Sequence, residues 1–263
     1  MFVYPEIDPV IFSIGPVAVR WYGLMYVVGF IAGWWLARRR AGLPHSPIRP
    51  EQVDDLVFYV MLGVILGGRL GYTFIYGWAE IAADPLYILK IWKGGMSFHG
   101  GLAGVLLAMW LFGRKIGRTM WQLTDYVAPF VPIGLGAGRI GNFINGELWG
   151  KPTDVPWAFQ VNGQVLHPTQ LYEALLEGLV LFVILYAYSA RPRPYMAVSG
   201  LFLLLYGIFR TFVEFYRVPD AHMGDGGYLA AGWLTTGMLL SAPMIAAGVI
   251  LLFLAYRKRE PAA

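Results

Sequence analysis

Long apolar stretches, separated by short polar connections, run through most of the chain. A helix needs about 20 predominantly apolar residues to cross a bilayer, and seven stretches reach about this length. They cover roughly residues 16–37, 53–76, 95–113, 120–140, 170–189, 196–217 and 233–256. The pattern predicts an all-α, polytopic membrane protein with seven transmembrane helices, which form a single integral-membrane domain over residues 1–263.

Positively charged residues gather beyond alternate apolar stretches, and this predicts the orientation in the membrane. Short cytoplasmic loops carry an excess of lysine and arginine. Basic clusters follow the first, third, fifth and seventh stretches: Arg38, Arg39, Arg40, Arg49, Arg114, Lys115, Arg118, Arg191, Arg193, Arg257, Lys258 and Arg259. We therefore expect the C-terminus and these connections on the cytoplasmic side, with the N-terminus outside.

The composition excludes several classes of protein. The chain is 57% hydrophobic and 14% charged, whereas soluble domains are about 45–50% apolar and about 25% charged. It contains no cysteine, which excludes disulfides, thiolate metal sites, iron–sulfur clusters and a cysteine nucleophile of its own. The four histidines are too scattered to form a close-spaced metal pair. We therefore expect no metal and no cofactor.

Four arginines lie inside or at the edge of apolar stretches: Arg69, Arg139, Arg210 and Arg217. The predicted orientation places all four in the outer half of the membrane. Each costs about 3 kcal/mol or more to insert, so the set needs a chemical reason. Because a guanidinium presents a planar fork of donors that suits phosphate, we expect an anionic ligand for the set as a whole.

Internal ion pairing is the alternative reading for any single arginine. In the sixth stretch, Tyr206, Arg210, Glu214 and Arg217 follow the spacing i, i+4, i+8, i+11 and form one helical stripe. The two arginines can therefore pair with Glu214 along the helix.

Other polar residues fall at the same predicted depth. Tyr22 lies near the outer end of the first stretch, where an interfacial aromatic belt is the alternative explanation. His99 stands between two glycine pairs at the start of the third stretch. Glycines allow another backbone or a substrate to come close. A lone histidine is usually structural, but this setting makes His99 a candidate for chemistry.

The densest polar constellation covers residues 134–150. Arg139 and Asn142 share a helical face, and the following Asn145-Gly146 pair favours a turn. Irregular polar backbone at the membrane surface is tolerated only where it is buried in protein or lines a wet cavity. The segment therefore predicts the wall of a site, in which Glu147 pairs with an arginine or holds a hydroxyl group.

An ordered set of motifs resembles the prolipoprotein diacylglyceryl transferase family. The motifs run through six of the seven predicted spans, and the seventh span matches in position and in its basic tail. They are Arg20-Trp21-Tyr22-Gly23, Gly68–Tyr72, Gly94–Gly101 (GGMSFHGG), Gly138–Gly150 (GRIGNFINGELWG), His167–Glu173 (HPTQLYE), Tyr206–Arg210 and Glu214–Asp220.

This resemblance implies an enzyme of the bacterial cytoplasmic (inner) membrane, with its active site toward the periplasmic half. Such enzymes transfer the diacylglyceryl group of phosphatidylglycerol to the lipobox cysteine thiol of a preprolipoprotein. They form a thioether and release glycerol phosphate in the first step of lipoprotein maturation. The expected partners are therefore phosphatidylglycerol, the lipobox signal peptide and the bilayer, and no nucleic acid.

The resemblance also carries residue roles. It puts Arg139 and Arg210 at the centre of catalysis, and either His99 or Arg210 activates the thiol. A further set of residues lines the phosphatidylglycerol site together with Arg139. Asn145 and Arg69 are included in this set because their side chains can donate hydrogen bonds to the lipid. This lining is Tyr22, Asn142, Asn145, Glu147, Gly150, Tyr206, Glu214, Arg217 and Arg69.

A transporter or flippase for an anionic or phosphorylated substrate is the competing hypothesis, because buried arginines and glycine-rich helices suit it equally well. Carriers with alternating access more often place their site near the midplane between repeated, interrupted helices. The chain has no convincing internal repeat, and its polar residues cluster in the outer half. A purely structural scaffold would leave the arginines without purpose.

Overall fold

The computed structural model of the protein describes residues 1–15, 17–90, 94–219, 228–230 and 233–258. The chain forms two compact units. The larger unit contains Met1–Leu36 and Asp125–Ala263, and the smaller unit contains Ala37–Thr124. The single integral-membrane domain expected from the sequence stays a prediction, and each unit is described by itself below.

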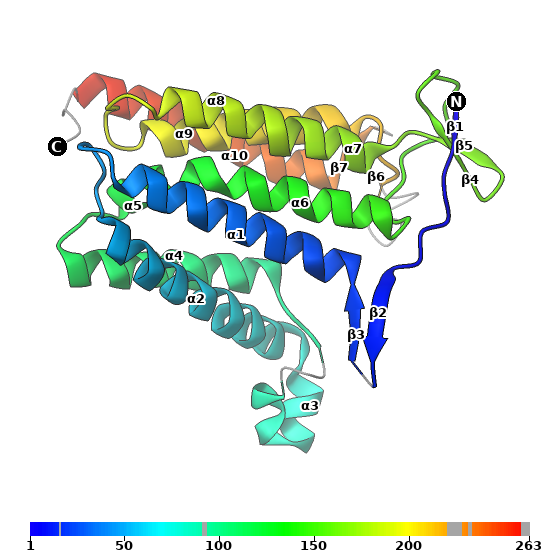
Figure 1. Cartoon of the computed structure of the whole chain (residues 1–263), viewed down its shortest axis with the longest axis horizontal. Coiled ribbons are helices and arrows are strands. Elements are labelled where there is room, and N and C mark those ends of the chain that lie inside the picture. The colour runs from blue at the N-terminus through cyan, green and yellow to red at the C-terminus, as the bar shows by residue number, and fades with distance from the viewer. Residues whose placement is uncertain (16, 91–93, 220–227, 231–232, 259–263) are drawn as a thin grey trace. The chain divides into compact units, whose positions relative to one another are not determined.

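Helices make up most of the larger unit (Figure 1). Some of them are joined end to end into longer rods. The helical segments are α1 (Trp21–Ala41, whose last turn belongs to the smaller unit), α5 (Met120–Val127, mostly in the smaller unit), a 3₁₀ turn (Ala128–Phe130), α6 (Val131–Ile144), α7 (Thr169–Glu173), a π-helical segment (Ala174–Val180), α8 (Leu181–Tyr188), α9 (Ala197–Glu214) and α10 (Thr236–Lys258).

Small residues and apolar side chains hold these helices together. A Cβ atom added to Gly178 in the π-helical segment would lie 2.7 Å from Cα of Gly136 in α6, so the two backbones touch. Val198 of α9 and further apolar residues pack around Leu181 and Leu185 of α8, which have no exposed surface. These contacts fix α6, α8 and α9 against one another, and this positions the polar residues described below.

Short strands lie beyond the helix ends. A three-stranded sheet has the order β1-β4-β5, with β1 parallel to β4 and β4 antiparallel to β5. Two further pairs, β2-β3 and β6-β7, are antiparallel. The strands are β1 (Phe2–Val3), β2 (Val10–Ile14), β3 (Val17–Arg20), β4 (Phe159–Val161), β5 (Gln164–Leu166), β6 (Tyr228–Ala230) and β7 (Leu234–Thr235).

The smaller unit is built on α2 (Pro50–Tyr76) and α4 (Phe98–Ile116), which pack side by side along glycine-lined faces (Figure 1). A short helix α3 (Trp78–Ala83) and a 3₁₀ helix (Pro85–Leu89) lie between them in the chain. A Cβ atom at Gly63 would come within 2.6 Å of the Gly104 carbonyl oxygen. The four-residue glycine spacing thus brings two helix backbones into contact, as small-residue motifs do in membranes.

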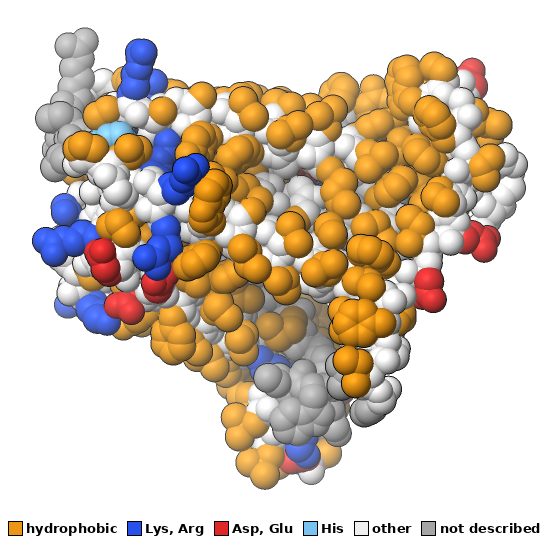
Figure 2. Space-filling model, viewed as in Figure 1, with side chains coloured by type: hydrophobic (Ala, Val, Ile, Leu, Met, Phe, Trp, Pro, Cys, Tyr) orange, Lys and Arg blue, Asp and Glu red, His pale blue; other side chains and the backbone are white. Residues whose placement is uncertain are grey.

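Five helical rods are long and apolar enough to cross a membrane among the described residues: Pro50–Tyr76, Met120–Ile144, Thr169–Tyr188, Ala197–Glu214 and Thr236–Arg257. They coincide with five of the seven predicted spans. The structure is thus that of a mostly helical, polytopic membrane protein. Large apolar side chains such as Phe58 and Phe253 are exposed along the helices, and Figure 2 shows how widely such side chains cover the surface.

Several helix ends differ from the predicted spans by a few residues. The helix predicted from residue 16 begins at Trp21, because Val17–Arg20 pairs with Val10–Ile14 across a turn in which Gly15 has φ of +58°. The sixth span ends at Glu214 and not at 217. The seventh helix begins at Thr236, since Leu234 and Thr235 form a strand.

Candidate active site

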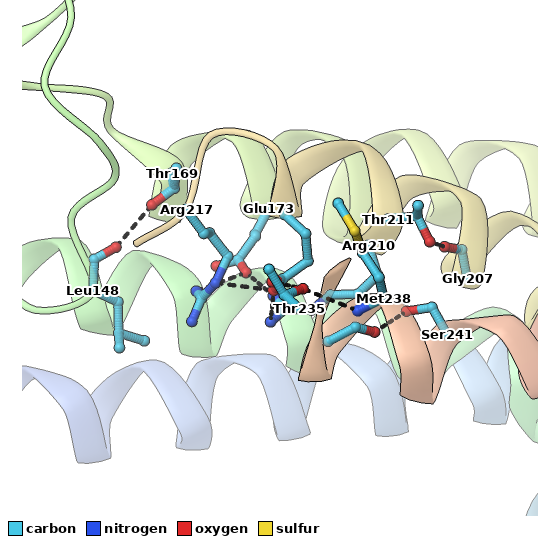
Figure 3. A network of polar contacts seen from close by, with 12 residues as sticks. Leu148, Thr169, Glu173, Gly207, Arg210, Thr211, Arg217, Thr235, Met238 and Ser241 are labelled. Atoms are coloured by element: carbon cyan, nitrogen blue, oxygen red, sulfur yellow. Dashed lines mark hydrogen bonds and ion pairs between the residues drawn. The ribbon is translucent and has the colours of Figure 1, made fainter. Parts of the chain in front are cut away.

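Three arginines of the larger unit converge on one carboxylate, Glu173. Figure 3 shows two of them, Arg210 and Arg217, beside Glu173. Arg139 of α6 approaches the Oε2 atom of Glu173 through Nε at 3.2 Å. Arg217 donates to Oε1 through Nη1 at 3.1 Å, and Arg210 of α9 donates to the same oxygen. The Glu173 side chain has 0% of its surface exposed, so this carboxylate forms the buried base of the cluster.

A second carboxylate, Glu214, binds two of the same arginines. Arg210 contacts it one helical turn away, and the Nε atom of Arg217 lies 3.2 Å from its Oε1 atom. Thr235 also donates to Glu214 from Oγ1 at 2.7 Å. We call Arg139, Glu173, Arg210, Glu214 and Arg217 the arginine cluster. Its members come from different parts of the sequence, so the helix packing assembles it.

The arginine side chains of the cluster are more exposed than its carboxylates. The side chains of Arg139, Arg210 and Arg217 are 23%, 16% and 11% exposed, whereas those of Glu173 and Glu214 are 0% and 5% exposed. The guanidinium groups are therefore held in place by ion pairs with the buried carboxylates and keep part of their surface accessible. Such fixed donors suit an anion, because they need not reorganise when charge arrives.

The helical stripe expected in the sixth span is confirmed, because Arg210 and Arg217 both pair with Glu214. Arg217 lies just beyond the end of α9, where it forms a β-bridge with Gly150. Glu173 was absent from the predicted site residues although it ends the HPTQLYE motif. The signal that could have found it is an acidic residue inside an apolar stretch, which requires a cationic partner.

The segment after α6 forms the predicted turn. Gly146 has φ of +69°, and the side-chain amides of Asn142 and Asn145 both donate to Glu147, each at 3.2 Å. Glu147 is therefore held by two asparagines. Gln170 of α7 donates to the Glu147 carbonyl oxygen and ties the turn to the helix that carries Glu173.

Thr169 is the first residue of α7. Its Oγ1 atom donates to the carbonyl oxygen of Leu148 at 2.8 Å, while Pro168 occupies the cap position. Thr169 thus joins the turn after α6 to the start of α7.

Gly150 lies where three backbone segments cross. A Cβ atom there would come within 2.5 Å of the Tyr216 carbonyl oxygen, 2.6 Å of the Thr169 methyl group and 2.8 Å of the His167 Cβ atom. Its N–H donates to the His167 carbonyl oxygen at 2.8 Å. Only glycine fits at this position. The β-bridge between Gly150 and Arg217 holds the segment that carries Arg217 in place.

Tyr22 and Tyr206 are also placed in the larger unit. The Tyr22 hydroxyl lies 3.1 Å from that of Tyr26, and its ring covers Gly141 of α6, where a Cβ atom would be 2.8 Å away. Tyr206 of α9 stacks on Phe202 and packs against the core around Leu181. Tyr22 therefore packs against the helix that carries Arg139, and Tyr206 lies on the helix that carries Arg210.

His167 lies outside the membrane-spanning rods, before α7. Its Nδ1 atom is 3.0 Å from the Tyr172 hydroxyl, and its ring packs edge-on against Tyr216. Burial lowers the pKa of His167 below its ordinary value. The imidazole therefore stays neutral at neutral pH and serves the packing of this loop.

Arg69 and His99 belong to the smaller unit, so their predicted place beside the arginine cluster stays a prediction. Arg69 is buried, and its guanidinium donates hydrogen bonds to backbone carbonyl oxygens of the segment between α2 and α4. Its acceptors are Tyr87, Ile88 at 3.1 Å, Gly94, and Gly95 at 3.3 Å. Those bonds tie this segment to α2.

His99 is the second residue of α4. Ser97 precedes the helix and caps it by accepting a hydrogen bond from Gly100 N–H at 3.2 Å. The Ser97 N–H donates in turn to the Gly68 carbonyl oxygen of α2 at 2.9 Å. The start of α4, and with it His99, is therefore anchored to α2 by backbone contacts.

Among the described residues, no group of three or more His, Cys, Asp or Glu side chains is arranged to hold a metal ion. The fold and the arginine cluster together define a multi-pass membrane protein with a cationic site built between its helices.

Comparison with known proteins places the chain in a family. The family model described as prolipoprotein diacylglyceryl transferase matches residues 9–254. Relatives named phosphatidylglycerol–prolipoprotein diacylglyceryl transferase are similar over the whole length. The protein of Ectopseudomonas mendocina is 57% identical, covering 99% of this chain and 98% of the relative. That of Pseudomonas syringae pv. tomato is 56% identical, covering 100% and 98%. The chain belongs to the prolipoprotein diacylglyceryl transferase family.

Proposed function

We propose that the protein transfers the diacylglyceryl group of phosphatidylglycerol to the lipobox cysteine of preprolipoproteins. The observation that carries this proposal is the arginine cluster, in which three guanidinium groups are fixed on two buried carboxylates. Membership of the family supports it, since relatives of the same length are named for this reaction.

The arginines suit the charge that moves during the reaction. The thiol sulfur attacks the glyceryl carbon, the bond between that carbon and the phosphate oxygen breaks, and the thiol proton is lost. The products are a thioether and glycerol phosphate. Arg139 and Arg210 bind the phosphate in this proposal. Arg139 contacts Glu173 through Nε, and its two terminal nitrogens remain for the charge that develops on the leaving group.

The lining residues complete the lipid site in the same proposal. Those that accompany the two catalytic arginines are Tyr22, Asn142, Asn145, Glu147, Gly150, Tyr206, Glu214, Arg217 and Arg69. Asn142 and Asn145 orient Glu147. Its carboxylate can accept a hydrogen bond from a hydroxyl group of the glycerol headgroup. Gly150 positions Arg217 through their β-bridge.

Thiol activation has two candidates, His99 and Arg210. A free cysteine has a pKa of about 8.5, and a neighbouring cation or base lowers the barrier to forming the thiolate. The variant His99→Gln separates them. Loss of turnover that is restored by raising the pH supports a histidine base, whereas substantial turnover in the variant contradicts it.

The membrane arrangement belongs to the proposal as well. Seven spans, with α1 and α4 added to the five rods described above, give an N-terminus in the periplasm and a C-terminus in the cytoplasm. The protein then lies in the bacterial inner membrane with its arginine cluster toward the periplasmic half.

Reconstitution tests the function directly. The purified protein is combined with phosphatidylglycerol and a peptide that carries one lipobox cysteine, and both the peptide mass and released glycerol phosphate are measured. We expect a diacylglyceryl mass gain that disappears with a Cys→Ser peptide. Folded protein that forms no product with several anionic lipids would contradict the proposal and favour a transporter.

A further inference from the structure

Glu177 is a buried acid that the proposed reaction does not use. It lies in the π-helical segment, four residues after Glu173, and has 0% of its surface exposed. Neither of its carboxyl oxygens has a hydrogen-bond partner among the described residues. Glu173 and Glu214, by contrast, both contact arginines directly.

The charged and titratable groups that act on Glu177 come from every neighbouring element. They are Glu173 on its own helical rod, Arg139 on α6, Tyr206 and Arg210 on α9, and Arg217 just after α9. Glu173, which carries the like charge, lies four residues before Glu177 on the same rod. The three arginines already direct donors at Glu173 and Glu214, and no bond of theirs to Glu177 is formed.

An ionised carboxylate in this position would be costly. Transfer of a charge into an apolar environment without hydrogen bonds costs several kcal/mol even after relaxation, and a buried group commonly neutralises instead. A neutral carboxylic acid has a much smaller desolvation cost. The absence of a donor therefore favours the protonated form.

We propose that Glu177 is held as a neutral carboxylic acid and thereby leaves the arginine cluster with a surplus of positive charge. The cluster contains three arginines and two contacting carboxylates. An ionised Glu177 would cancel the remaining charge, whereas a neutral one preserves it for an anionic headgroup. The anion rests on the proposed function, whereas the protonation state follows from the burial of Glu177 and from its lack of a hydrogen-bond partner among the described residues.

Infrared spectroscopy of the full-length protein in phosphatidylcholine nanodiscs tests this directly. The difference spectrum between the wild type and Glu177→Gln should contain the C=O stretch of one protonated carboxyl group at neutral pH, shifted in heavy water. The matched control is Glu173→Gln, which should remove the two stretches of an ionised carboxylate. Carboxylate stretches in the Glu177→Gln difference spectrum would overturn the proposal.

A second measurement keeps the test independent of the variant's folding. Wild-type protein labelled with ¹³C at the glutamate side-chain carboxyl should show an isotope-shifted protonated C=O band. Absence of any such band would also overturn the proposal.

Adding phosphatidylglycerol to the nanodiscs distinguishes this inference from the proposed function. The protonated band should persist when the anionic lipid is present, and its disappearance would refute a neutral Glu177. Failure to form product after a lipobox peptide is also added, while the band remains, would count against the transferase activity alone.

Discussion

At the scale of single residues, Glu173 determines how the cations are arranged. Three guanidinium groups contact its carboxylate, which has no exposed surface. Removing one partner from a buried, charged contact costs about 3–5 kcal/mol, so the arginines depend on this group for their positions. A fully buried glutamate therefore determines where the partly exposed arginine side chains of the site lie.

Replacing Arg139 or Arg210 by alanine should nearly abolish diacylglyceryl transfer while the protein still inserts into the membrane. Loss of a donor that stabilises developing charge lowers turnover on the order of a hundredfold or more. The assay is lipidation of the lipobox peptide by reconstituted protein. Arg193→Ala, a change in the loop after α8, serves as the matched control, and near wild-type turnover in either site variant would refute the phosphate-binding role.

Replacing Arg69 by methionine should loosen the segment between α2 and α4. The change keeps the apolar stem but removes the hydrogen bonds to Ile88, Gly94 and their neighbours. Hydrogen exchange should become faster at residues 94–97, with exchange at residues 236–258 as the internal control. Unchanged exchange together with a raised KM for phosphatidylglycerol would instead show that Arg69 contacts the lipid.

The sequence predicts four of the five members of the arginine cluster, because charged groups stand out in apolar stretches. Arg139, Arg210, Arg217 and Glu214 were all found in this way, and the structure brings them together. Glu173 was missed because its importance lies in three contacts from other elements, which no local pattern reveals. The hydrogen bonds of Arg69 to carbonyl oxygens were equally hidden, since a backbone acceptor leaves no trace in the sequence.

At the scale of elements, close backbone contact defines the pair α2 and α4. A Cβ atom at Gly104 would collide with the Gly63 carbonyl oxygen and lie 2.9 Å from Cα of Gly67. Backbone atoms cannot move aside as a flexible side chain can. Any residue larger than glycine at position 104 would therefore force the two helices apart.

The variant Gly104→Val should destabilise the smaller unit, because overpacking a tight contact costs about 1–3 kcal/mol. The measurement is the thermal unfolding midpoint of detergent-solubilised protein. Gly134→Ala is the control, since a Cβ atom there meets nothing within 4 Å. An unchanged midpoint for Gly104→Val would mean that the two helices can separate without cost.

Element boundaries were predictable only where a local signal marks them. The Asn145-Gly146 pair predicted the turn after α6. The start of α1 was misplaced because Val17–Arg20 is apolar enough for a span but pairs as a strand with Val10–Ile14. Strand pairing depends on a partner elsewhere in the chain, and hydropathy alone does not detect it.

At the scale of the whole molecule, the distribution of charge predicts which connections face the cytoplasm. The chain has no native cysteine, so an introduced one labels without background. In sealed right-side-out vesicles, a membrane-impermeant thiol reagent should label a cysteine at Lys151 but not one at Arg193. Both should label after permeabilisation, and labelling at 193 alone would invert the topology.

The π-helical segment Ala174–Val180 affects how α8 is rotated, about the axis of the rod, relative to α7. A π-turn accommodates an extra residue in an otherwise α-helical rod, and one residue corresponds to about 100° of rotation in an α-helix. Inserting one further residue after Leu179, which is 58% exposed, would exceed what the π-turn accommodates and would turn α8 relative to α7 by about this angle. Leu181 and Leu185 would then face away from their core. Insertions and deletions in this rod are therefore constrained by angle as well as by length, so homologous chains should conserve the number of residues between Glu173 and Leu181.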